Sequence, residues 1–130
     1  MSKENELSII SNNASIMNIL DKDKELMPFF NIIYLYTLNI AGIRYYIDND
    51  LYLEENEELR LKRESENQYD KYAIAVYNSE KKIGYIPRRN NKVFARLMDG
   101  GKSILAKVKC VDYYFDEIED IQIRLYLDDF

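Results

Sequence analysis

The chain has 130 residues, a formal net charge of −5, one cysteine and no histidine. This length corresponds to one domain, and a hydrophobic fraction of 47% is typical of a globular protein. The lack of histidine excludes every Ser-His and Cys-His nucleophile pair, and a single cysteine excludes an internal disulfide and a cysteine-rich zinc site.

Residues 1–29 are predicted to form a helical appendage. Apolar residues at helical spacing indicate one or two short amphipathic helices, with a break near "SNNAS". The segment lacks the basic-then-apolar order of a signal peptide, and no run in the sequence approaches the ~18 apolar residues of a membrane span. We therefore expect a cytoplasmic protein.

Residues 30–130 are predicted to form a mainly β domain with one inserted helix. The predicted strands comprise residues 30–43, 57–64, 72–78, 81–87, 103–115 and 119–127. A short polar turn joins the third and fourth of these, which predicts a hairpin. Gly42 is expected to end the first strand or to form a bulge, and Cys110 is expected in the core.

The inserted helix is predicted over residues 90–102. Asn90 or Asn91 can cap its start, and Gly100 stops it. Its expected apolar face consists of Val93, Phe94 and Leu97. Several short strands with one inserted helix predict a small OB-like β-barrel with helical decoration.

Charges of opposite sign are segregated along the sequence. Between Lys81 and Lys109 the only acidic residue is Asp99, whereas acids are concentrated in 48–58 and 112–129. The local field of the basic stretch can steer an anionic ligand although the chain is acidic overall. A cluster of acids in the second region invites a metal site, namely Asp112, Asp116, Glu117, Glu119 and Asp120. It lacks the spacing and the glycine of an EF-hand, so we expect an exposed loop and no metal.

One segment combines aromatic and basic residues, and a second contains a pair of arginines. A protein that binds single-stranded nucleic acid needs aromatic faces for bases and cations for phosphates. Arg44, Tyr45 and Tyr46 supply both, although a strand end with a surface arginine would give the same pattern. Arg88 and Arg89 come directly before the predicted helix. A solvated loop would give the same pattern, but basic side chains at a helix start oppose the helix dipole and favour a bound anion.

The segment "RESENQYDKYAIAV" (63–76) places a large ring and a carboxylate, Tyr69 and Asp70, where a loop meets a strand. Asp70 can cap the turn into that strand, which is a common role for aspartate. It can also face a ligand. Both hold together if one carboxylate oxygen caps the turn and the other faces the ligand.

Three segments in register resemble the HIRAN domain, a module of Rad5-type and helicase-like-transcription-factor remodellers that also occurs as a stand-alone bacterial protein. They are "AGIRYY" (41–46), "LRLKRESENQYDKYAIAVYN" (59–78) and "KIGYIPRRNNKVFARLMDGG" (82–101), and the resemblance covers residues 38–115. Two prolines of the family pattern are replaced by Ser65 and Gln68, so we expect a looser loop. Tyr85 stands where some relatives carry histidine.

The resemblance implies an OB-type barrel that captures the free 3′ end of single-stranded DNA. By that resemblance, Arg44 and Tyr45 hold the terminal nucleotides, Tyr69 and Asp70 meet the terminal sugar, and Arg88 contacts the backbone. The resemblance also implies that a ring near the end of "CVDYYF" (110–115), either Tyr113 or Tyr114, completes the pocket. The expected DNA-binding residues are Arg44, Tyr45, Tyr46, Asn67, Tyr69, Asp70, Tyr85, Arg88 and Tyr113.

Three functions are compatible with these residues. The first is a module without catalysis or cofactor that recognises single-stranded DNA, at its free 3′-OH end, in DNA repair or replication-fork processing. The second is an interaction module that docks a helicase or nuclease. The third is a metal-dependent nuclease, which needs convergent carboxylates that no tight motif of the sequence offers.

Overall fold

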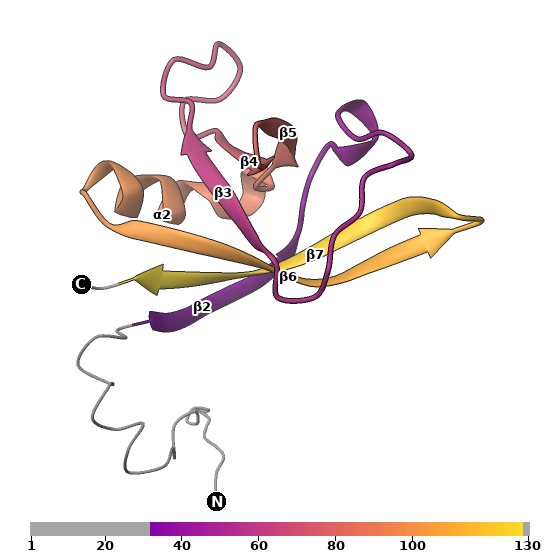
Figure 1. Cartoon of the computed structure of the whole chain (residues 1–130). Coiled ribbons are helices and arrows are strands. Elements are labelled where there is room, and N and C mark those ends of the chain that lie inside the picture. Colours follow the sequence, from indigo (N-terminus) through magenta and orange to yellow (C-terminus); the bar gives the residue numbers. More distant parts are fainter. Residues whose placement is uncertain (1–31, 129–130) are drawn as a thin grey trace, which may run out of the picture. The chain divides into compact units, whose positions relative to one another are not determined.

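The structure is a computed structural model that describes residues 32–128 (Figure 1). The strands are β2 (Ile32–Asn39), β3 (Glu58–Arg63), β4 (Ile74–Asn78), β5 (Lys81–Tyr85), β6 (Ser103–Tyr114) and β7 (Glu117–Asp128). Between them lie a short 3-10 helix, η2 (Ile43–Tyr45), and an α-helix, α2 (Arg88–Asp99). The helical appendage expected at residues 1–29 lies outside the described residues. Neither helix of this described part is long and apolar enough to cross a membrane.

The strands form one six-stranded antiparallel sheet in the order β2-β7-β6-β3-β4-β5. Its two edges meet at a single point beyond the end of β2. There the N–H of Ala41 donates to the carbonyl of Tyr85 at 2.7 Å, and the N–H of Tyr85 donates back at 2.9 Å. The sheet is therefore curled and barrel-like, but its first and last strands are not joined by a continuous ladder of hydrogen bonds. The predicted mainly β fold with one inserted helix is confirmed.

Gly84 of β5 allows the two edges to approach each other. A Cβ atom at this position would lie 2.6 Å from the carbonyl oxygen of Ala41, closer than real Cβ contacts. The residue also has a φ of +158°, which side chains rarely allow. A glycine is therefore required in the "GYIP" segment, because only a residue without a side chain lets the two edges of the curled sheet come into contact here.

The core lies between the curled sheet and α2. Its fully buried side chains are Leu59, Ile74, Val76, Ile83, Ile86, Val108, Ile121, Ile123 and Leu125. From α2, Phe94 and Ala95 join this cluster, and Leu97 packs against it from the side. Val93 is 58% exposed, so its predicted place on the buried face is wrong. The helix turns Asn91, Phe94 and Ala95 inward, which leaves Val93 on the adjacent flank.

The start of α2 also differs from the prediction. The helix begins at Arg88 rather than Asn90, and its N-cap position is Pro87, which forms no side-chain capping bond. Proline is suited to the start of a helix because its missing N–H has no intrahelical partner there. Neither Asn90 nor Asn91 caps the helix, and Asn91 is buried instead.

The outer part of the β6–β7 hairpin extends beyond the core. Cys110 is exposed, so its predicted core position is wrong. The inward alternation of β6 ends at Val108, where the pairing with β7 shifts register. The acidic residues do not form the expected loop. Asp112 and Glu117 belong to paired strands, and only Phe115 and Asp116 form the turn between them. The hairpin end projects away from α2 (Figure 1).

Candidate nucleic-acid interface

A pocket of about 320 Å³ lies where the β3–β4 loop, the end of β5 and the start of α2 meet the segment after β2. We call it the tyrosine pocket. Its lining consists of Ala41, Gly42, Tyr46, Asn67, Tyr69, Asp70, Ala73, Tyr85, Ile86 and Arg88. It therefore brings together six of the predicted site residues, Tyr46, Asn67, Tyr69, Asp70, Tyr85 and Arg88, from three separate sequence segments.

Asn67 organises the β3–β4 loop from within. Its side-chain oxygen accepts hydrogen bonds from the backbone N–H groups of Tyr69, at 2.8 Å, and Asp70, at 3.1 Å. Its amide nitrogen donates to Glu64 at 3.0 Å. The residue thus holds the backbone that presents Tyr69 and Asp70. Its role in the site is to position these neighbours.

The carboxylate of Asp70 is held by three neighbours, and its side chain is 16% exposed. Oδ1 accepts a hydrogen bond from the N–H of Tyr72 at 2.9 Å, which confirms the predicted turn cap. Oδ2 accepts a hydrogen bond from the side-chain amide of Asn91 at 2.8 Å and lies 3.6 Å from Nε of Arg88. Oδ2 keeps acceptor capacity, since a carboxylate has about four lone-pair sites.

Asn91 is the residue that sequence reasoning missed. Buried on α2, it ties the helix to the carboxylate of Asp70, 21 positions away along the chain. A buried asparagine requires a hydrogen-bond partner, and here that partner lines the pocket. The sequence offers no signal for this role, because an asparagine near a helix start is first interpreted as a cap.

Arg88 and Tyr69 form the mouth of the pocket. A guanidinium N–H of Arg88 donates to the backbone carbonyl of Tyr69 at 3.0 Å. The guanidinium is otherwise exposed and has further donors for an anion. The Tyr69 side chain is 85% exposed, so both faces of its ring are accessible.

A charged network supports the opposite wall. The Tyr85 hydroxyl donates to Glu64 at 2.8 Å, and the Lys82 ammonium lies 2.7 Å from the same carboxylate and 2.9 Å from the Tyr85 hydroxyl. The ring of Tyr85 meets that of Tyr46 edge to face, with centroids 5.8 Å apart. These contacts fix the orientation of both rings toward the pocket.

The network is charged at neutral pH. Burial alone would raise the pKa of Glu64, but hydrogen bonds from Lys82, Asn67 and Tyr85 lower it below the usual 4.5. Burial would lower the pKa of Lys82, yet its bonds to Glu64 and Tyr85 raise it above 10.5. Burial, together with the neighbouring Glu64, raises the pKa of the Tyr85 hydroxyl above 10.0. Tyr85 therefore stays a neutral donor.

Three predicted site residues lie outside the tyrosine pocket. Arg44 lines a different cavity, beside Tyr114 and Glu117 of the hairpin. Tyr45 is 81% exposed on η2, and Tyr113 is exposed on β6. For Arg44 and Tyr45 the cause is the tight turn after Gly42, whose φ of +76° starts η2 and points successive side chains in different directions. Tyr113 lies in the outer part of the β6–β7 hairpin. Among residues 32–128, no group of three acidic or cysteine side chains could hold a metal ion.

A family model and two solved structures match this chain. The model of the HIRAN domain matches residues 33–128. A crystal structure of a protein from Lactobacillus plantarum is 31% identical, with a TM-score of 0.63, over 74% of this chain and 94% of that one. The crystal structure of the HIRAN domain of human HLTF is 22% identical, with a TM-score of 0.56, over 75% and 81%. No curated protein matches. The chain therefore belongs to the HIRAN domain family, as its sequence segments predicted.

Proposed function

We propose that the tyrosine pocket binds the free 3′ end of single-stranded DNA and that the domain is a binding module without catalysis. The observation that carries this proposal is the placement of Asp70. The largely buried carboxylate of Asp70 lines a pocket of about 320 Å³ together with the exposed Tyr69 and with Arg88, whose Nε is 3.6 Å away. Pockets of roughly 300–1,000 Å³ enclose small ligands, a size that suits a terminal nucleoside.

A carboxylate near a polyanion is repulsive unless it meets a hydrogen-bond donor. On a DNA strand, the exposed donor that belongs to neither base nor phosphate is the terminal hydroxyl. Oδ2 of Asp70 can accept from this 3′-OH because Asn91 occupies only one of its lone-pair sites. Such a bond is charge-assisted, which makes it stronger than a bond between neutral groups.

The other residues complete the recognition of a strand end. The exposed ring of Tyr69 offers a stacking face for the terminal base or sugar. Arg88 lies beside it, with exposed donors for the phosphate that precedes the terminal nucleoside. Arg44 and Tyr45 lie on the turn between the lining residues Gly42 and Tyr46, and we place the next nucleotides there.

The family resemblance supports a proposal for the cellular role. We propose that the domain acts in DNA repair or replication-fork processing and that a helicase or nuclease works on the captured strand. An alternative is an adaptor that docks such an enzyme through protein contacts alone. The metal-dependent nuclease has the least support, since the carboxylates at the site are held by Asn91, Lys82 and backbone groups.

A competition experiment tests the proposal. Fluorescein-labelled single-stranded DNA with a free 3′ end is displaced by unlabelled strands that end in 3′-OH, end in 3′-phosphate, or are closed circles. We expect the 3′-OH strand to compete at least about tenfold better than the other two. Equal competition by all three would show that the pocket does not recognise an end, and substrate cleavage with magnesium would contradict the absence of catalysis.

A further inference from the structure

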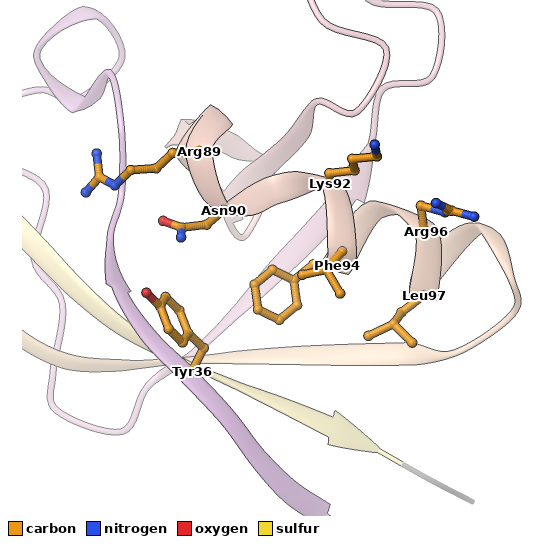
Figure 2. A pocket seen from close by; sticks show the side chains of 8 residues that line it. Tyr36, Arg89, Asn90, Lys92, Phe94, Arg96 and Leu97 are labelled. Atoms are coloured by element: carbon orange, nitrogen blue, oxygen red, sulfur yellow. The ribbon is translucent and has the colours of Figure 1, made fainter.

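A second and larger groove lies between α2 and β2, with a volume of about 710 Å³. We call it the α2 groove. Its lining consists of Tyr36, Arg89, Asn90, Lys92, Val93, Phe94, Arg96 and Leu97 (Figure 2). It shares no lining residue with the tyrosine pocket. The proposed function therefore leaves this groove without a role.

The floor of the α2 groove is apolar. The rings of Tyr36 and Phe94 face each other across it, with centroids 6.2 Å apart (Figure 2). Val93 adds an exposed aliphatic side chain, which sequence analysis expected in the core. Exposed apolar surface that is grouped in a groove typically marks an interaction site.

The rim of the groove is basic. Arg89, Lys92 and Arg96 follow one another at intervals of three and four residues, which places them along one side of α2. No acidic side chain is among the lining residues. Within residues 32–128, none of these three side chains forms an ion pair. The ammonium group of Lys92 lies over the ring of Tyr72. The groove therefore suits a ligand that is both apolar and acidic.

The end of the β6–β7 hairpin has this complementary chemistry. Phe115 is 82% exposed and packs edge to face on the exposed Tyr114, with ring centroids 4.4 Å apart. Exposed acids flank the two rings along the hairpin, namely Asp112, Asp116, Glu117 and Glu119. This group, Asp112–Glu119, is called the hairpin tip. Its two rings and its negative charge match the apolar floor and basic rim of the α2 groove.

The backbone of the hairpin tip supports a role for Phe115 beyond folding. Tyr114 pairs with Glu117, so Phe115 and Asp116 form a two-residue turn. Their φ angles are +53° and +69°, and such turns favour Asn-Gly because β-carbons disfavour this region. A bulky residue held in this conformation is a feature of functional sites, where the side chain rather than the backbone explains its presence.

We propose that the hairpin tip of one copy binds in the α2 groove of a second copy. A tip cannot reach the groove of its own chain, because the hairpin projects away from α2 (Figure 1). The contact joins two different surfaces, so one such contact by itself leaves one free tip and one free groove on the pair. Tyr36, which is 46% exposed, offers an oligonucleotide one stacking face, but the rest of the floor offers no second one, since Phe94 is buried and Val93 is aliphatic.

The experiment uses the full chain in analytical ultracentrifugation from about 1 µM to 1 mM, the range expected for a small interface. We expect the wild type to associate as concentration rises, and less so at high salt. Lys92→Glu breaks the groove, and Phe115→Asn breaks the tip. Each variant alone should lose association by at least about tenfold. Lys62→Glu is the matched control, since Lys62 is exposed, lines neither site, and should leave association unchanged.

Mixing the two broken variants is the decisive measurement. A Phe115→Asn chain keeps its groove and a Lys92→Glu chain keeps its tip, so an equimolar mixture should form dimers and stop there. Phe115→Asn should also raise the thermal unfolding midpoint, because asparagine tolerates the left-handed conformation. A folding defect therefore cannot explain its lost association.

Three outcomes would overturn the proposal: a wild type that stays monomeric throughout, a mixture that forms no dimer, or variants that associate as the wild type does. If Lys92→Glu instead weakens oligonucleotide binding in a monomeric protein, the groove belongs to the nucleic-acid interface. Failure here would not affect the tyrosine pocket, whose 3′-end preference should be the same in the wild type and Phe115→Asn.

Discussion

The substitution Asp70→Asn separates end recognition from the fold of the loop. Asparagine keeps a side-chain oxygen that can accept from the N–H of Tyr72, so the turn cap survives. Rotation of the Asn91 amide allows it to pair with the new amide in place of the carboxylate. The Arg88 contact, at 3.6 Å with an exposed guanidinium, contributes little to stability. We therefore expect a folded protein that has lost one charge in the tyrosine pocket.

The expected magnitude follows from the bond that is lost. A hydrogen bond to a charged group contributes about 1.5–3 kcal/mol, which corresponds to a factor of about 10–150 in affinity for the 3′-OH strand. A 3′-phosphate never forms this bond, and in the wild type it is also repelled by the carboxylate. Asp70→Asn should therefore weaken binding of the 3′-OH end, strengthen binding of the 3′-phosphate end, and bring the two within about threefold of each other.

The assay is fluorescence anisotropy with labelled strands that end in 3′-OH or 3′-phosphate, on the wild type, Asp70→Asn and Glu66→Gln. Glu66 is an exposed carboxylate of the same loop that does not line the pocket, so its variant reproduces the charge change alone. We expect Glu66→Gln to keep the end preference. The reasoning is refuted if Asp70→Asn keeps it too, or if both variants lose it equally.

Three further predictions follow from the structure. Tyr69→Ala should weaken single-strand binding by about 1–3 kcal/mol without changing the unfolding midpoint, because the exposed ring can stack a base but packs little against the protein. If the wild type and the variant bind with equal affinity in anisotropy titrations, Tyr69 is not part of the site. Gly84→Ala should lower the free energy of unfolding by about 1–3 kcal/mol in urea denaturation, since its Cβ would lie 2.6 Å from the carbonyl oxygen of Ala41. Gly100→Ala should cost less, because Gly100 has a negative φ and its Cβ would lie 3.3 Å from the carbonyl oxygen of Arg96. Because the pKa of Glu64 is lowered in the folded state, its contribution to stability is present above about pH 4.5 and is lost as pH falls through the folded-state pKa. Because the pKa of Lys82 is raised, its contribution is present below pH 10.5 and is lost as pH rises through its folded-state pKa. Glu64→Gln should therefore flatten the acidic limb of stability measured against pH, and an unchanged limb would contradict the network.

Within residues 32–128, the sequence by itself determined the strands and the inserted α-helix. Alternation of apolar residues predicts β3, β4 and β5 within about two residues of their observed bounds, because a half-buried strand needs that period. The three family-like segments predicted which residues of the tyrosine pocket come together, including Tyr69, Asp70 and Arg88.

Only the tertiary structure decided which side chains share a surface. Val93 is exposed because the core lies along a different line of α2, and Cys110 is exposed because the hairpin runs past the core. Tyr45 is separated from the tyrosine pocket by a single tight turn. Asn91 reaches Asp70 across 21 positions of sequence. Each outcome depends on contacts between distant segments, and the periodicity of one segment carries no information about which neighbour covers its face.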